Sequence, residues 1–259
     1  MSMLNARSIL VTGSNRGIGL ELVKQLVEKS NRPEWIFATC RDPEGPGAQA
    51  LKNLAAKHEG VVINPLDTCK PNSIKAAAAR VTECLKGAGL NLLINNAGIV
   101  RPASMEDETP ESMSEVYRTN VIGHMVVTQA FLPLLRKASR ESPQKGMSCS
   151  KAAIINVSSE AGSITNLLGW EVGHSINYRC SKAALNMLTR CQSLGFAEDE
   201  ILCVALHPGW LQTDMGNFEG ILAPVKVDEG VKEILNTLAC LSEKNNGTFV
   251  NIDGETLPW

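Results

Sequence analysis

The sequence predicts an α/β protein in which a doubly wound parallel sheet of about seven strands carries helices on both faces. Short apolar or β-branched runs alternate with longer stretches of helical spacing along the whole chain. A glycine cluster follows the first of these runs and opens the first helical stretch. No linker rich in proline or serine interrupts the alternation. We therefore expect residues 1–259 to form a single domain with the Rossmann arrangement.

Each strand–helix–strand unit should cross over with a right hand, and ligands should gather beyond the carboxyl ends of the strands. Strands are predicted over Ser8–Thr12, Trp35–Cys40, Val61–Leu66, Leu90–Asn95, Ala152–Ser158, Ile201–His207 and Gly247–Ile252. Helices are predicted over Ile18–Ser30, Ala48–His58, Ser73–Lys86, Met113–Lys137, Tyr178–Ala197 and Lys226–Leu241. The polar stretch Glu141–Lys151 is predicted to be an inserted surface loop.

The composition argues against several classes of protein. The 25 basic and 27 acidic residues form no basic stripe, which disfavours a nucleic-acid-binding protein. No apolar run approaches the roughly 18 residues that span a bilayer, so we expect no membrane insertion. The eight cysteines include no CxxC pair and are expected to be reduced thiols. The amino-terminal apolar run leads into the glycine cluster and is interpreted as a strand, so we expect a cytoplasmic protein.

The glycine cluster has the spacing expected of a phosphate-binding turn. Gly13, Gly17 and Gly19 follow the first strand with the pattern GxxxGxG. Glycines permit a tight turn and let backbone N–H groups approach a pyrophosphate at the positive end of a helix. The spacing differs from both the GxGxxG fingerprint and the P-loop. Its place after the first strand of a βαβ pattern nevertheless indicates a dinucleotide site.

The end of the second strand indicates which dinucleotide binds. Folds that take NAD usually place a carboxylate there to bind the ribose 2′-hydroxyl, whereas this chain has Cys40 followed by Arg41. Arg41 and Arg16 could together bind a 2′-phosphate through charge-assisted hydrogen bonds. We therefore predict NADP(H) rather than NAD. The alternative is that both arginines are solvated and that Asp42 replaces the missing acid.

A series of motifs in a fixed order resembles the short-chain dehydrogenase/reductase family over nearly the whole chain. The motifs are TGSNRGIG at 12–19, Asp67, NNAG at 95–98, Asn120, Ser158-Ser159, YRCSK at 178–182, and HPG at 207–209 with Thr213. Within the family, the stretches TCRDPE, LHPGWLQTDM and NGTFVNIDGETLPW are similar to the sniffer-type carbonyl reductases.

The resemblance implies a set of residues that contact the cofactor. Asp67 and Thr68 should contact the adenine, and Asn96, Ala97 and Gly98 should line the cofactor groove. The nicotinamide end should contact Pro208, Gly209, Leu211, Thr213, Tyr178 and Lys182. The complete expected cofactor site adds Gly13, Ser14, Asn15, Arg16, Gly17, Ile18, Gly19 and Arg41.

Tyr178 and Lys182 are the predicted centre of the chemistry. Reduction of a carbonyl needs a hydride, which the nicotinamide supplies, and a proton, which a protein acid must supply. The unperturbed pKa of tyrosine lies near 10, and a cation beside it can lower that value. Tyr178 and Lys182 stand four apart at a predicted helix start and therefore share a face. Alone, such a pair would be a packed tyrosine and a solvated lysine, but its position between Ser-Ser and HPG favours catalysis.

Two further residues complete the expected catalytic set. Ser159, the second serine of the motif VSSxxG, should donate to the substrate oxygen as an oxyanion-type stabiliser. By resemblance, Asn120 should bend its helix and hold a water that relays protons to Lys182. The interval between Ser159 and Tyr178 is longer than is usual in the family, with Asn166–Ser175 extending the loop.

The substrate should be a small apolar or aromatic carbonyl compound. Its pocket is expected from Val100–Glu108, Asn166–Ser175 and Trp210–Ala223, which carry apolar residues that include Trp170, Trp210, Met215 and Phe218. These residues could equally pack against the domain itself. The histidines His124, His174 and His207 have no ligand spacing, so no metal is expected.

The sequence leaves assembly and the direction of reaction open. By resemblance, the long helix Met113–Lys137 and the helix after Tyr178 should form the faces of a homodimer or homotetramer. Two alternatives to a carbonyl reductase remain: a non-enzymatic NADP(H)-binding redox sensor, and an NAD(P)-dependent alcohol or steroid dehydrogenase that mainly oxidises alcohols. Loss of Tyr178 or Lys182 would favour the sensor, and both residues are present.

Overall fold

A seven-stranded parallel sheet organises the structure, a computed structural model that describes residues 3–171, 173–217 and 220–259. The strands lie in the order β3-β2-β1-β4-β5-β6-β7, and every neighbouring pair is parallel. They are β1 Ser8–Thr12, β2 Trp35–Cys40, β3 Val61–Pro65, β4 Leu92–Asn95, β5 Ala153–Val157, β6 Leu202–Leu206 and β7 Phe249–Val250. The predicted fold class is confirmed. The strand order reverses between β1 and β4, where doubly wound folds bind ligands.

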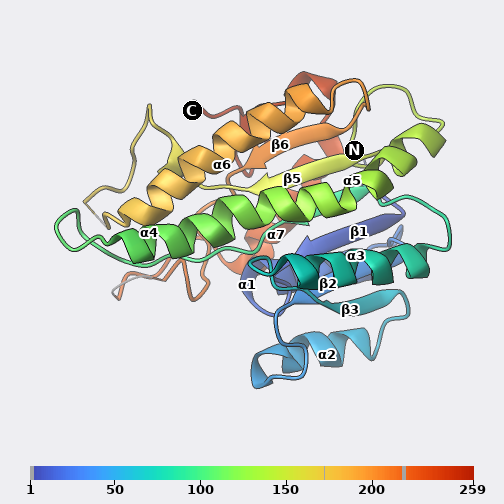
Figure 1. The fold of residues 1–259 in the computed structure, drawn as a ribbon, viewed down its shortest axis with the longest axis horizontal. Helices are drawn as coiled ribbons and strands as arrows, with labels where there is room; N and C mark the ends of the chain where they lie inside the picture. The colour runs from blue at the N-terminus through green and yellow to red at the C-terminus, as the bar shows by residue number, and fades with distance from the viewer. Residues whose placement is uncertain (1–2, 172, 218–219) are drawn as a thin grey trace.

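Helices cover both faces of the sheet. Figure 1 shows α3, α5 and α6 crossing one face, with α1 and α7 behind the other. The α-helices are α1 Gly17–Glu28, α2 Gln49–Ala55, α3 Pro71–Leu85, α4 Pro110–Tyr117, α5 His124–Glu141, α6 Ile176–Gly195 and α7 Val227–Cys240. Short helical turns are η1 Pro46–Ala48, η2 Arg118–Gly123, η3 Glu160–Gly162 and η4 Glu243–Asn245.

Two apolar cores lie on opposite faces of the sheet because successive strand residues point to opposite sides. In β1, Ile9 and Val11 join the core that includes residues of α1 and α7. Leu10, between them, joins the core that includes residues of α3 and α5. All three side chains are fully buried. The helices therefore hold the strands from both sides, and the loops at the strand ends are left to form a site.

The prediction of one continuous helix over Met113–Lys137 is wrong in detail. The chain forms α4, the π-helical turn η2 and α5 instead. The bend expected at Asn120 lies in this wide turn. Gly123 packs so closely against Thr68 that a Cβ there would lie 2.9 Å from Thr68 Cβ. The widened turn carries the Asn120 amide to the backbone of Ile99, which it bonds on both its N–H and its C=O.

The stretch 141–151 is only partly the surface loop that was predicted. Met147 and Cys149 are buried in the core that includes residues of α7, and Ser148 forms an isolated bridge with Ser242. Their apolar side chains draw this part of the loop inward. In the described ranges 3–171, 173–217 and 220–259, no helix combines the length and apolarity needed to cross a bilayer.

Candidate active site

The predicted site residues converge at one edge of the sheet. The glycine turn follows β1, Asn96–Gly98 follow β4, Ser158 and Ser159 follow β5, and His207–Gly209 follow β6. These four strands are neighbours, and the carboxyl ends of parallel strands meet at the same edge. Residues far apart in the sequence are therefore brought together around one groove.

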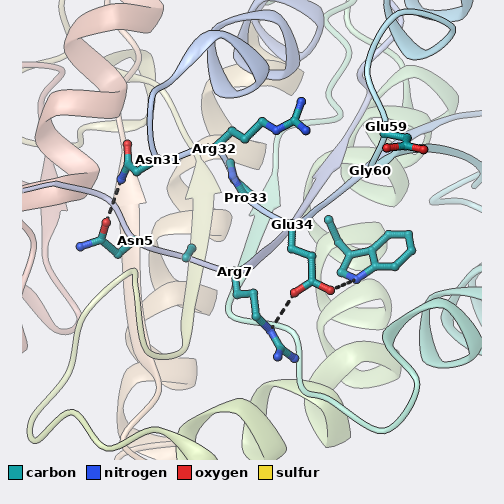
Figure 2. A pocket seen from close by; sticks show the side chains of 10 residues that line it. Asn5, Arg7, Asn31, Arg32, Pro33, Glu34, Glu59 and Gly60 are labelled. Atoms are coloured by element: carbon teal, nitrogen blue, oxygen red, sulfur yellow. Dashed lines mark hydrogen bonds and ion pairs between the residues drawn. The ribbon is translucent and has the colours of Figure 1, made fainter.

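A surface hollow of about 670 Å³ lies at the opposite edge, where the loops lead into β1, β2 and β3. Figure 2 shows Arg7 and Glu34 facing each other there, paired at 3.7 Å. Glu34 also accepts a hydrogen bond from the Trp35 indole. Asn31 also donates to Asn5 at 2.8 Å, and none of the predicted site residues lies among the residues that line this hollow.

The turn after β1 is built so that only glycine fits at its key positions. Gly13 and Gly17 have φ of +68° and +53°, a region that glycine adopts without strain. A Cβ on Gly19 would lie 2.2 Å from the Gly13 carbonyl oxygen. Arg16, the N-cap of α1, makes no side-chain capping bond. The N-cap side chain therefore does not occupy the first N–H groups of α1, and these groups can donate to the pyrophosphate of a dinucleotide.

A brace through Thr12 fixes the groove between β1 and β4. The Thr12 hydroxyl accepts hydrogen bonds from the backbone N–H groups of Asn96 at 2.9 Å and Ala97 at 3.0 Å. In return, the Asn96 side-chain amide donates to the Thr12 carbonyl at 2.9 Å. Asn96 thus acts by holding two loops together rather than by pointing into the groove. Thr12 was missing from the predicted site, although its place before Gly13 was the available signal.

The end of β2 presents an unpaired cation. The Arg41 side chain is exposed and has no ion-pair or hydrogen-bond partner among the described residues. The Asp42 carboxylate is already engaged, because its Oδ1 accepts from the backbone N–H groups of Glu44 and Gly45 at 3.1 and 3.0 Å. Arg16 forms an ion pair with Asp214 at 3.0 Å in which both side chains are mostly exposed. Such surface pairs contribute about 0–1 kcal/mol and do not commit Arg16.

The other predicted cofactor residues differ in how they face the groove. The Asp67 carboxylate accepts from the Cys69 backbone at 3.0 Å and lies 3.5 Å from Lys70. Leu211 is buried, and its side chain packs beside Gly230 of α7. Elsewhere Ser14 donates to the Val11 carbonyl, Asn15 donates to the Gly47 carbonyl, and Thr213 accepts from the Gly216 backbone.

Tyr178, Ser159 and Lys182 lie together at the start of α6. The Ser159 hydroxyl forms a hydrogen bond with the Tyr178 side chain. Lys182 Nζ lies 5.4 Å from the centre of the Tyr178 ring and donates to the Val157 carbonyl at 2.7 Å. Ser159 follows the carboxyl end of β5, and the other two occupy the first two turns of α6. The α6 start was predicted two residues late, at Tyr178 instead of Ile176.

The electrostatics of this cluster differ from the simple expectation that Lys182 lowers the pKa of Tyr178. Burial raises the pKa of Tyr178 above its usual value of 10, and the Ser159 hydrogen bond lowers it by less. Burial also lowers the pKa of Lys182 to about 7. Lys182 is therefore only partly protonated at neutral pH, which weakens its effect on the phenol. The phenol is held in its protonated form, as an acid requires.

The two adjacent serines have different surroundings. Ser158 is buried, and its hydroxyl donates to Asn186 Oδ1 at 2.6 Å. Ser159 is partly exposed; its hydroxyl accepts from the Ala161 backbone at 3.2 Å and bonds Tyr178. Ser158 is thus used in packing β5 against α6, whereas Ser159 faces the phenol. Ser159 therefore stays the predicted catalytic serine of the pair.

Asn120 ties the groove to α6. Its Oδ1 accepts from the Ile99 backbone at 2.9 Å, and its Nδ2 donates to the Ile99 carbonyl at 2.9 Å and to Ser181 Oγ at 3.0 Å. Asn120 is completely buried. A Cβ on Gly98 would lie 3.5 Å from Asn120 Oδ1 and 3.8 Å from Lys182 Nζ, so both side chains converge on Gly98.

Two histidines, His124 fully buried and His207 partly exposed, support the site as neutral groups. His124 Nε2 lies 2.7 Å from the Ala97 carbonyl, and burial together with Lys182 lowers its pKa to about 3. His207 Nδ1 accepts from the Glu160 backbone at 3.2 Å, and burial lowers its pKa to about 4. Each is a neutral imidazole that positions a loop. Among the described residues, no group of three or more His, Cys, Asp or Glu could hold a metal ion.

Arg179 organises the long loop before α6. Its guanidinium donates to the carbonyls of His174, Leu168 and Gly173 at 2.8, 2.9 and 3.0 Å. It also lies 5.6 Å from the Trp170 ring centre. Arg179 was not predicted, because nothing in the sequence says which carbonyls a guanidinium will meet. Phe218, a predicted pocket residue, lies outside the described residues. Exposed apolar side chains on the described parts of the expected pocket loops are Met105, Leu167, Leu168, Trp210, Met215, Ile221 and Leu222.

Comparisons with known proteins show what the chain is similar to. Residues 7–220 match the family model described as short chain dehydrogenase. An NADPH-bound carbonyl reductase from chicken fatty liver is 58% identical, with a TM-score of 0.95 over 99% of this chain and 100% of that one. Carbonyl reductase Sniffer of D. melanogaster is 39% identical, with a TM-score of 0.92 over 98% and 100% of the chains. An uncharacterized oxidoreductase of Schizosaccharomyces pombe is 32% identical over 96% of each chain.

Proposed function

The chain belongs to the short-chain dehydrogenase family, and from this we propose that it is an NADPH-dependent carbonyl reductase that converts a ketone, aldehyde or quinone to the alcohol. The observation that carries the proposal is the cluster of Ser159, Tyr178 and Lys182 beside a glycine cradle. The similarity to the NADPH-bound chicken carbonyl reductase over almost the full length of both chains supports it.

We assign the binding of NADP(H) to the groove at the switch between β1 and β4. The N–H groups after Gly13 would hold the pyrophosphate, and Arg41, assisted by Arg16, would bind the 2′-phosphate. One oxygen of Asp42, Oδ1, is used within its own loop, which makes this carboxylate a poorer partner for the 2′-hydroxyl of NAD. When bound, NADPH supplies the hydride that reduces the substrate carbon.

The chain's own residues supply the proton and orient the substrate oxygen. The Tyr178 hydroxyl donates the proton, which its raised pKa keeps in place at neutral pH. Ser159 donates a hydrogen bond to the same oxygen and stabilises the charge that develops there. Lys182 stabilises the phenolate left behind. Asn120, which is bonded to Ile99 and Ser181, would hold a water that returns a proton towards Lys182.

The proposal also covers the cellular location and the oligomeric state of the protein. We propose a cytoplasmic protein, consistent with its eight free cysteines. We also propose a homodimer or homotetramer that uses the outer faces of α5 and α6. Exposed apolar side chains at Ile122, Met187 and Leu194 lie on this side and support a contact. A small carbonyl compound is the proposed partner, with no nucleic acid or membrane.

The proposal is tested by NADPH consumption at neutral pH against quinones, diketones and aromatic aldehydes, with NADH in a parallel series. We expect turnover of at least one class, with kcat/KM for NADPH at least tenfold above that for NADH. One ionic contact to the 2′-phosphate is enough for this ratio, since about 1.4 kcal/mol corresponds to tenfold. Binding of NADPH without turnover would instead support a redox sensor. Faster oxidation of alcohols by NADP or NAD would support a dehydrogenase.

A further inference from the structure

The helix that carries Tyr178 lacks an N-terminal cap from its own segment. Ser175, at its N-cap position, has φ of +39° and makes no side-chain capping bond, and the first turn holds no acidic residue. A carboxylate from another loop takes this place. Glu108 Oε2 accepts hydrogen bonds from the Asn177 backbone N–H at 3.2 Å and from its side-chain Nδ2 at 2.6 Å. One of the N–H groups that every helix start leaves unpaired is thus satisfied from outside.

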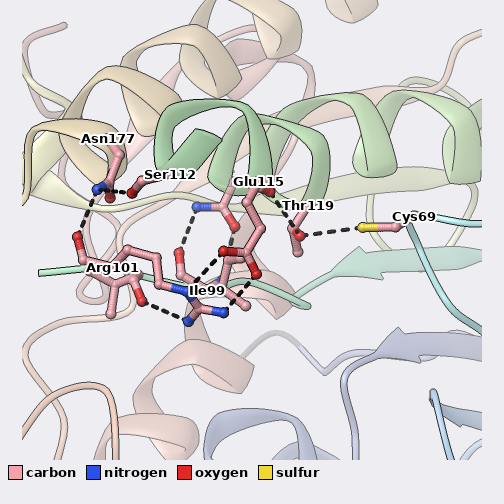
Figure 3. A network of polar contacts seen from close by, with 9 residues as sticks. Cys69, Ile99, Arg101, Ser112, Glu115, Thr119 and Asn177 are labelled. Carbon is pink, nitrogen blue, oxygen red and sulfur yellow. Dashed lines mark hydrogen bonds and ion pairs between the residues drawn. The ribbon is translucent and has the colours of Figure 1, made fainter. Parts of the chain in front are cut away.

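Asn177 is fixed in one orientation by the acceptors around it. It is completely buried, and its Nδ2 also lies 2.7 Å from the Arg101 carbonyl and 3.1 Å from Ser112 Oγ. Figure 3 shows Asn177 between Ser112 on α4 and the backbone of Arg101. Three acceptors surround the nitrogen, so a flipped amide would face its oxygen towards them. Asn177 therefore joins the start of α6 to the loop after β4 and to α4.

Glu108 has the charge that this role requires. Burial pushes its pKa up, but hydrogen bonds from Ser112, the Thr109 backbone and Asn177 outweigh this, and its pKa is lowered. The carboxylate is therefore ionised at neutral pH. A negative charge at a helix N-terminus interacts favourably with the helix dipole. The next residue after Asn177 is Tyr178, so the cap acts directly beside the phenol.

We propose that Glu108, through Asn177, caps α6 from the loop after β4 and thereby positions Tyr178 for proton transfer to a carbonyl oxygen. Glu108 is a positioning residue, and the proposal rests on the proposed function of Tyr178. The loop that carries it, residues 99–109, is also an expected wall of the substrate pocket. The fold of this pocket wall and the position of the acid Tyr178 therefore depend on each other.

The test compares Glu108→Ala, Glu108→Gln and the control Glu111→Ala in the full chain. Glu111 is an exposed glutamate in the first turn of α4, three residues away and outside the expected pocket loops. We expect Glu108→Ala to lower kcat at least tenfold, because misplacement of a reacting group by about 1 Å can cost about 10²-fold. Its Kd for NADPH should stay within about twofold, because the cap touches no predicted cofactor residue except Tyr178. Glu108→Gln keeps an acceptor oxygen and should recover part of the loss.

Asn177→Ala and Asn177→Asp extend the test, since aspartate would place two carboxylates against each other. We expect Asn177→Asp to be the slower of the two. Amide hydrogen exchange of residues 176–180 gives a readout that does not need turnover: exchange should quicken in Glu108→Ala and not in Glu111→Ala. Unchanged exchange and kcat in folded Glu108→Ala would overturn the proposal, as would a parallel loss of NADPH affinity. If exchange quickens in Glu108→Ala but the wild-type protein reduces no carbonyl compound, the result contradicts the proposed function alone.

Discussion

Replacing Tyr178 by phenylalanine should lower kcat by about 10²–10⁴-fold, the contribution of a positioned general acid. The change removes one hydroxyl and leaves the ring, so packing at the start of α6 is kept. It also removes the hydrogen bond between Tyr178 and Ser159, which leaves the Ser159 hydroxyl free to bind solvent. We expect NADPH to bind with nearly unchanged Kd. The measurement is steady-state NADPH oxidation with saturating substrate, together with the Kd from fluorescence titration.

The chain offers a matched control, because it has only two tyrosines. Tyr117 ends α4, and burial raises its pKa, as it raises that of Tyr178. Tyr117→Phe removes the same atom outside the catalytic cluster and should keep kcat within about twofold of wild type. If Tyr178→Phe retains wild-type kcat, or if both variants lose activity equally, Tyr178 is not the acid.

Replacing Lys182 by methionine should lower kcat by about 10²-fold, near the lower end of what an acid–base group contributes. The side chain keeps its length but loses the charge that stabilises the Tyr178 phenolate and the donor to Val157. NADPH affinity should also fall, since this lysine is expected to bond the nicotinamide ribose. A variant with normal kcat would contradict the assigned role.

Stability provides a second readout for Lys182. Burial lowers its pKa to about 7 in the folded protein from the ordinary lysine value of 10.5, so the unfolded chain binds more protons between these pH values. The free energy of unfolding of wild type should therefore rise from pH 7 towards pH 10, and Lys182→Met should lack this rise. Lys151, which is buried and paired with Glu200, is the control lysine. Lys151→Met should leave kcat unchanged.

Much of the fold follows from local pattern. The alternation of apolar runs and helical stretches predicted all seven strands and their parallel arrangement, because β-branched runs bounded by turns have few other solutions. The break in the helix at Asn120 was anticipated as a bend, but its extent was not. That depends on Gly123 packing on Thr68, a contact between residues 55 positions apart in the chain.

The residues of the site also fall into two groups, those that the sequence indicates and those that only the tertiary structure reveals. Gly13 and Gly19 were indicated by their spacing after the first strand, and the pair Tyr178 and Lys182 by its place between Ser-Ser and HPG. Glu108 and Arg179 act through backbone groups of other segments. A carboxylate in a loop and an arginine on a helix have no sequence signal that identifies their partners. Only the tertiary structure shows which backbone groups these two side chains bind.

The most direct test of the central claim is isotope transfer. NADPH with deuterium in place of both hydrogens at C4 of the nicotinamide is incubated with the wild-type protein and with a ketone or aldehyde that turns over. The account predicts an alcohol with one deuterium on the carbinol carbon, formed in equal amount to the NADP produced. In the same time, Tyr178→Phe should form less labelled alcohol than wild type by a factor of about 10² or more. Consumption of NADPH with no labelled alcohol would contradict it, because the electrons would then have reached another acceptor.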